Sequence, residues 1–168
     1  MHPAKDPEMD MPDARAIIRR HQERADLGAV NVENIAGDLG INVWQSDLSP
    51  GMSGKLFRDP RHGGPSGYSI LVNRLDSAVR KRFTLAHEIA HFILHRAEFS
   101  DELVDDAHYR SGLSNQKEAE ANKLAAEILM PREQIEQVRQ SGIRSPESLA
   151  MRFGVSVQAM KIRLGIPL

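Results

Sequence analysis

Hydrophobic and polar positions recur with helical spacing in the first part of the chain and change to strand-like runs further on. The helical spacing predicts one helix over residues 13–26 and a shorter one over residues 32–39. Three β-prone runs follow, at residues 41–44, 55–57 and 68–72, each bounded by Gly, Pro or Ser. We therefore expect two N-terminal helices followed by a small three-stranded sheet.

Two longer helices are expected beyond the sheet. The first covers residues 77–95 with Asp76 as its cap, and it is apolar on most sides, which is typical of a central, buried helix. The second covers residues 116–130 and stops before Pro131, because the residue preceding a proline disfavours the helical conformation. Three short helices are expected after it, over residues 132–140, 146–153 and 157–164.

This order of elements predicts an α+β protein, with the sheet packed on the two long helices. We expect a flexible N-terminal arm over residues 1–12, which holds three prolines and no periodicity. A domain over residues 13–130 would hold the sheet and both long helices. Residues 131–168 would form a three-helix region whose last two helices resemble a helix-turn-helix.

Composition narrows the class of protein. Of the 168 residues, 40% are hydrophobic and 27% charged, which allows a packed core, and a net charge of −1 argues against a chain-wide basic surface. The absence of cysteine excludes disulfides and thiolate ligands and suits a reducing cytosol. With no apolar stretch long enough for a membrane span or signal core, we expect a cytoplasmic protein without membrane contact.

The strongest chemical signal is an H-E-x-x-H pattern inside the first long helix. His87 and His91 are four residues apart, so they lie about 40° apart around the helix and both imidazoles can reach one ion. Glu88 lies on the flank of the same face, where its carboxylate could take a proton from a water activated by that ion. Such a pattern also arises by accident, but a buried helix rarely holds three polar side chains without a use for them.

A third protein ligand is expected from the second long helix, because catalytic zinc usually takes three and leaves one position open. Glu118 shares a face with the small residues Ala121 and Ala125, which allow close helix packing, so we favour Glu118. Glu120 points about 160° away, toward solvent in this interpretation. His95 lies on the same helix face as His87 and His91, but it is too far along the helix axis to bind the same ion. We therefore expect it to end the helix or to hydrogen-bond a metal ligand.

Three segments of the chain resemble the ImmA/IrrE-type metallopeptidases. They read ILVN over residues 70–73, RFTLAHEIAHFILH over 82–95 and EAEANKLAAEILMP over 118–131. The last segment departs from the family pattern at Leu124, where Phe is usual, and at Ile128, where Leu is usual. The resemblance covers nearly everything from residue 14 to the end.

The resemblance implies a zincin-like fold and a zinc-dependent endopeptidase with one Zn²⁺ per chain, although another divalent metal remains open. It places the third metal ligand on Glu118, in agreement with the helix geometry. Characterised members cleave helix-turn-helix repressors and so release phage-like, mobile-element or stress-response genes. The strand over residues 68–72 has two interpretations, a buried core strand or an edge strand that aligns an extended substrate. In zincin-like proteins such an edge strand lies above the metal, which suggests the second role for Tyr68, Ile70 and Val72.

Further candidates are weaker, and two rival functions stay open. His108 and Tyr109, between the two long helices, could stabilise an oxyanion or form an ordinary loop. The last helix offers mainly Gln158, Lys161 and Arg163 for DNA, but residues 131–168 carry only a mild positive surplus. One rival is therefore a DNA-binding regulator with a structural metal, and the other is a toxin-like partner in a two-gene module.

Overall fold

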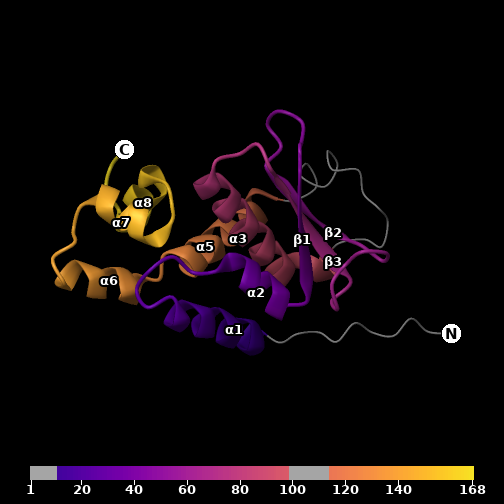
Figure 1. Ribbon diagram of the computed structural model, residues 1–168, viewed down its shortest axis with the longest axis horizontal. Coiled ribbons are helices and arrows are strands. Elements are labelled where there is room, and N and C mark those ends of the chain that lie inside the picture. The colour runs from indigo at the N-terminus through magenta and orange to yellow at the C-terminus, as the bar shows by residue number, and fades with distance from the viewer. Residues whose placement is uncertain (1–10, 99–113) are drawn as a thin grey trace.

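The computed structural model describes residues 11–98 and 114–168, and its elements match the expected α+β class (Figure 1). The N-terminal half contains α1 (Met11–Arg24), α2 (Val32–Asp38), β1 (Ile41–Ser46), β2 (Gly54–Arg58) and β3 (Tyr68–Asn73). Next come α3 (Ala78–His95), a 3₁₀ turn (Arg96–Glu98) and α5 (Asn115–Leu129). The chain ends with α6 (Arg132–Gln140), α7 (Pro146–Phe153) and α8 (Val157–Leu164).

The molecule is elongated, with the sheet toward one end and the C-terminal helices toward the other (Figure 1). Helices α3 and α5 pack against each other between these two ends, and α3 also packs on β2 and β3. The two long helices therefore connect the sheet to the C-terminal helices. Within the part of the chain that is described, none of the helices is long and apolar enough to cross a bilayer.

The sheet has three strands, as expected, in the order β1-β3-β2. β3 pairs in parallel with β1, where Ile41 lies opposite Tyr68, and antiparallel with β2, where Gly54 lies opposite Val72. The last strand in sequence is therefore the middle strand in space, and all but one of its six residues are buried.

Side-chain caps determine most helix starts. Asn31, Ser114, Ser145 and Ser156 each accept a hydrogen bond from a backbone N–H in the first turn of the helix that follows. For α3 the cap is Ser77, which accepts from the Arg80 N–H, rather than the expected Asp76.

The N-terminal helix starts earlier than the sequence suggested. Met11 and Pro12 already belong to α1, so the expected flexible arm over residues 1–12 is wrong at its last two positions. Proline is compatible with a first helical turn because the N–H it lacks would have no partner there. Residues 1–10 lie outside the described part.

One hydrophobic core runs through the molecule. It joins buried residues of α2 and the sheet, such as Ile35 and Ile70, to Ile89 of α3 and to Leu149 and Phe153 of α7. The short helices after residue 130 therefore share a core with the long helices that carry the H-E-x-x-H pattern.

Candidate metal centre

Helix α3 presents both histidines of the H-E-x-x-H pattern on one side. Their ring Nε2 atoms lie 3.1 Å apart, with His91 almost fully buried and the His87 side chain 17% exposed. The spacing of four residues, held by a helix that is buried along most of its length, produces this convergence.

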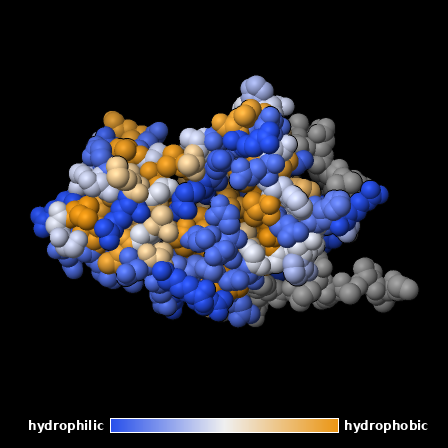
Figure 2. Space-filling view, viewed as in Figure 1, coloured by the Kyte–Doolittle hydropathy of each residue, from blue (hydrophilic) through white to orange (hydrophobic). Residues whose placement is uncertain are grey.

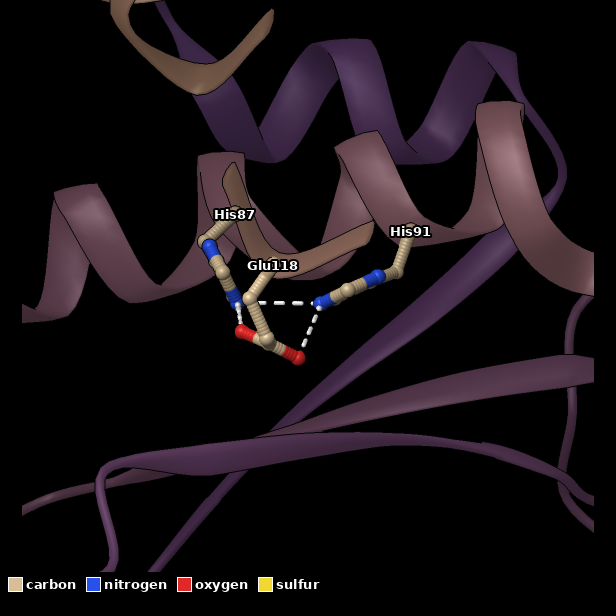
Figure 3. A group of neighbouring side chains, drawn as sticks. All are labelled: His87, His91 and Glu118. Carbon is tan, nitrogen blue, oxygen red and sulfur yellow. Dashed lines mark hydrogen bonds and ion pairs between the residues drawn. The ribbon is translucent and has the colours of Figure 1, made fainter. Parts of the chain in front are cut away.

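Glu118 meets the two histidines from the first turn of α5. Its Oε2 lies 3.2 Å from the His87 Nε2 and its Oε1 lies 3.2 Å from the His91 Nε2 (Figure 3). Ala121 and Ala125 are completely buried, and their small side chains allow α5 to approach α3 closely enough for this contact. The structure thus brings together the three side chains that sequence reasoning named as ligands.

The geometry of these three donors fits a small divalent ion. One ligand atom from each residue can be chosen so that all lie within 4.8 Å of one another. A tetrahedral zinc with ligands at about 2.0–2.1 Å separates its donor atoms by about 3.3 Å, close to the spacings observed here. No further His, Asp or Glu joins the group among residues 11–98 and 114–168.

Glu88 lies in the same cleft as the two histidines. The cleft is lined by α3, by the start of β2 and the residues before it, and by the first turns of α5. Glu88 is only 4% exposed, yet it contributes to this lining beside His87 and His91. A buried carboxylate at the edge of a metal cleft is suitably placed to exchange protons with whatever binds there.

Behind His91 lies a second pair of polar residues. The His91 Nδ1 is 2.9 Å from the His95 Nδ1, and the His95 Nε2 is 2.9 Å from a Glu120 carboxylate oxygen. If the His91 Nε2 keeps its lone pair for a metal, its Nδ1 carries the proton and donates to His95, which in turn donates to Glu120. The Glu120 carboxylate, which can only accept, then determines which ring nitrogen of His95 and which ring nitrogen of His91 carries the proton.

Sequence reasoning missed this role of Glu120. Glu120 is exposed, as its position on the helix indicates, but its carboxylate also bonds His95, and this hydrogen bond lowers the pKa of the Glu120 carboxyl. The helical wheel describes the direction of a Cβ, but a glutamate has three further torsions that can carry its carboxylate sideways. The available signal was His95 itself, since a buried histidine on the ligand stripe requires a polar partner.

The strand expected to align a substrate does not have the required position. Tyr68, Ile70 and Val72 are at most 4% exposed, and β3 is hydrogen-bonded on both sides, so it is not an edge strand. The expectation was wrong because a single strand does not reveal the order of the sheet.

The strand that borders the cleft is β2. Gly54 and Lys55 line the cleft. A Cβ at Gly54 would lie 2.5 Å from the Leu71 carbonyl oxygen and 2.6 Å from the Thr84 methyl group, so only glycine allows β2 to pass this closely over α3. The other proposed site residues, His108 and Tyr109, lie outside the described residues.

Comparison with known proteins identifies the family. A family model described as the IrrE N-terminal-like domain matches residues 36–165, and the chain belongs to this family. A curated relative, the radiation response metalloprotease IrrE of Deinococcus radiodurans, is 33% identical across 94% of this chain and 48% of that protein. The expected resemblance is therefore confirmed, although the chain spans about half the length of this relative.

A solved structure supports the fold. A transcriptional regulator from Mycobacterium tuberculosis superposes with a TM-score of 0.57 at 18% identity, and the match covers 91% of this chain and 46% of that one. At this level of identity, the likeness concerns the fold alone.

Proposed function

We propose that this protein is a zinc-dependent endopeptidase. The observation that carries the proposal is the convergence of His87, His91 and Glu118 on one point of a cleft that Glu88 also lines. Membership of the IrrE N-terminal-like family and the likeness to a radiation response metalloprotease support the same activity. A structural zinc is usually closed by four protein ligands, whereas three are available here in the described part of the chain.

In this proposal His87, His91 and Glu118 hold the ion, which supplies Lewis-acid polarisation of the substrate carbonyl and makes water a better nucleophile. Glu88 takes a proton from the water as its oxygen bonds to the carbonyl carbon. Glu88 then delivers that proton to the amide nitrogen as the C–N bond breaks. His95 and Glu120 keep the His91 ring in the orientation and tautomer that direct its Nε2 into the cleft.

We propose a helix-turn-helix transcriptional repressor as the substrate, cleaved in the cytoplasm to release the genes it controls. The support is the resemblance to ImmA/IrrE-type proteins together with the radiation-response role in the name of the curated relative. Zinc is the metal we favour, since two imidazoles and a carboxylate suit it well.

The test is incubation of the purified, zinc-loaded chain with repressors encoded beside its gene, with and without a chelator, followed by mass spectrometry of the products. We expect cleavage at one or a few bonds, abolished by chelation. Glu88→Gln should bind about one equivalent of zinc and lose at least about 100-fold in rate, since glutamine cannot accept the proton. Glu133→Gln, an exposed change on α6, is the matched control, and full activity of Glu88→Gln would remove Glu88 from the mechanism.

A further inference from the structure

A second groove opens beside the metal cleft, between the long helices and α8. Its walls come from the first half of α3, from α5, from Arg132 at the start of α6, and from the α7–α8 turn with α8. Arg80, Phe83 and Asn122 line both this groove and the metal cleft, so the two hollows adjoin. A chain segment bound in the groove would thus lie beside the metal centre.

The groove is positively charged. Four basic residues line it and no acidic residue does; the bases are Arg80, Lys123, Arg132 and Arg163. Within residues 11–98 and 114–168, none of these four forms an ion pair with a carboxylate. Burial and, after it, the nearby positive charge of Arg132 lower the pKa of Arg163, while the nearby carboxylate of Glu127 acts in the opposite direction. The excess of basic residues along the lining favours an anionic ligand.

The groove is also apolar along its floor. Met130 and Val155 are buried there, and Ile162 on α8 is 62% exposed although it lines the groove. Figure 2 shows the same mixture, with hydrophobic side chains interleaved among hydrophilic ones over the C-terminal helices. A ligand that complements both features carries acidic side chains on one side and aliphatic ones on the other.

We propose that this groove docks an acidic, amphipathic segment of the protein substrate outside the scissile bond. The proposal rests on the endopeptidase function and names the chemistry by which a substrate would be selected. Docking would raise the local concentration of the bond to be cut at the metal cleft, since both hollows share Arg80, Phe83 and Asn122.

A peptide is favoured over duplex DNA by the orientation of α8. Of the three side chains that the sequence offered for base contacts, Gln158 and Arg163 line the groove, and of these two Gln158 is also exposed while Arg163 is half-buried. Arg163 also donates to the Met130 carbonyl oxygen at 2.9 Å, which ties its guanidinium to the end of α5. Reading of a major groove requires such side chains to project outward from the helix.

The test measures binding of a short fluorescein-labelled peptide with Glu on one helical face and Leu on the other. Its partner peptides replace every Glu by Gln or every Leu by Ser. Fluorescence anisotropy with the full chain at about 0.15 M salt should show the Glu/Leu peptide bound at least about tenfold more tightly than either partner. Equal binding of the Gln peptide would overturn the proposal.

Variants locate the binding. Lys123→Gln with Arg132→Gln removes two exposed charges of the groove and should weaken binding about 3- to 10-fold. Arg15→Gln with Arg19→Gln removes the same charge from exposed positions on α1 and should leave binding unchanged. Ile162→Gln tests the apolar side, and Met151→Gln, an exposed apolar residue of α7 outside the groove, is its control.

The outcomes separate this inference from the proposed activity. Equal loss in the Arg15/Arg19 control, or displacement of the peptide by duplex DNA at comparable affinity, would overturn the docking proposal. Peptide binding with no proteolysis of any repressor would instead remove the endopeptidase function and leave a binding groove. Proteolysis that is unaffected by the groove variants on a full-length repressor would show that this substrate does not dock there.

Discussion

Glu118 and Glu120 lie two residues apart near the start of α5 and contact different histidines of α3. Glu118 contacts His87 and His91, whereas Glu120 contacts only His95 of the three histidines. A proposed ligand and the group behind a proposed ligand therefore lie close together in sequence, and their contributions to metal binding can be compared in one background.

We expect Glu118→Gln to lower zinc affinity by more than about 100-fold, because a donor atom is lost. Glu120→Gln should cost about tenfold, because only the orientation of His95 and hence of His91 is weakened. Competition with a chromophoric chelator measures both constants. A larger loss for Glu120→Gln would show that the donor set is misassigned.

Asp59 supports the turn between β2 and β3. Its carboxylate accepts from the His62 N–H and from the Ser69 hydroxyl, each at 2.9 Å. The His62 N–H is the largest cause that lowers the pKa of the Asp59 carboxyl below its usual 3.8. Because the folded pKa is the lower one, the stabilisation is present above pH 3.8 and is lost as the pH falls through the folded value.

Asp59→Asn should therefore reduce stability at neutral pH, and its difference from the wild type should shrink as the pH falls below 3.8. Urea unfolding between pH 7 and pH 3 measures the effect, with Glu23→Gln on the exposed side of α1 as control. A difference that grows toward low pH would contradict the assignment.

At this scale the sequence predicted well that His87 and His91 lie side by side, because one helical period determines where both side chains point. It did not predict the carboxylate that bonds His95, which depends on how two helices cross. The spacing of residue types along the sequence does not reveal side-chain torsions or the angle at which two helices cross.

At the scale of elements, Arg82 of α3 joins three segments. Its guanidinium donates to the Val30 carbonyl oxygen at 2.8 Å and, at the end of α7, to those of Gly154 at 3.0 Å and Phe153 at 3.4 Å. Gly154 has φ +68°, and a Cβ there would lie 2.8 Å from the Arg82 Nε. Glycine at position 154 therefore allows both the left-handed backbone that ends α7 and the close approach of the Arg82 guanidinium.

We expect Arg82→Met to destabilise the fold by about 2–3 kcal/mol, because several carbonyl groups lose a charged donor. Arg152→Met removes a single bond to the Leu27 carbonyl from an exposed side chain, so it should cost less than about 1 kcal/mol. Chemical denaturation of both variants measures the difference. Equal costs would show that Arg82 does not join these segments energetically.

Helix ends were the most predictable elements, because their signals are local. Ser145, Pro146 and Gly154 enclose α7 as expected, the cap of α3 lies one residue later, at Ser77, and α1 begins two residues earlier than expected. The order of strands was not predictable, since pairing of Ile41 with Tyr68 depends on residues far apart in sequence. The incorrect edge role for Tyr68, Ile70 and Val72 arose because the sequence does not reveal the order of the strands.

For the whole molecule, the proposed metal links helices that the sequence separates. His91 and Glu118 come from α3 and α5, and these helices also pack through a core that extends from the sheet to α8. Metal binding should therefore add stability to a fold that already has its own core, rather than create the fold.

We expect zinc at about 100 times its dissociation constant to stabilise the protein by about 2.7 kcal/mol. Calorimetry should show a melting temperature that rises with zinc concentration in the wild type. His91→Ala should retain a melting transition but lose its dependence on zinc. Complete unfolding of the wild type on chelation would instead indicate that the metal is required for folding.

The strand order also has a consequence for the time course of folding. β1 and β2 contact only β3 within the sheet, so neither has a partner until residues 68–73 are available. The β2–β3 pair closes a shorter loop than the parallel β1–β3 pair, so it loses less chain entropy on pairing. We therefore expect the amides of β2 and β3 to gain protection from hydrogen exchange before those of β1. β3 ends only a few residues before α3 begins, so the last strand that the sheet requires and the histidine-bearing helix become available in immediate succession during synthesis.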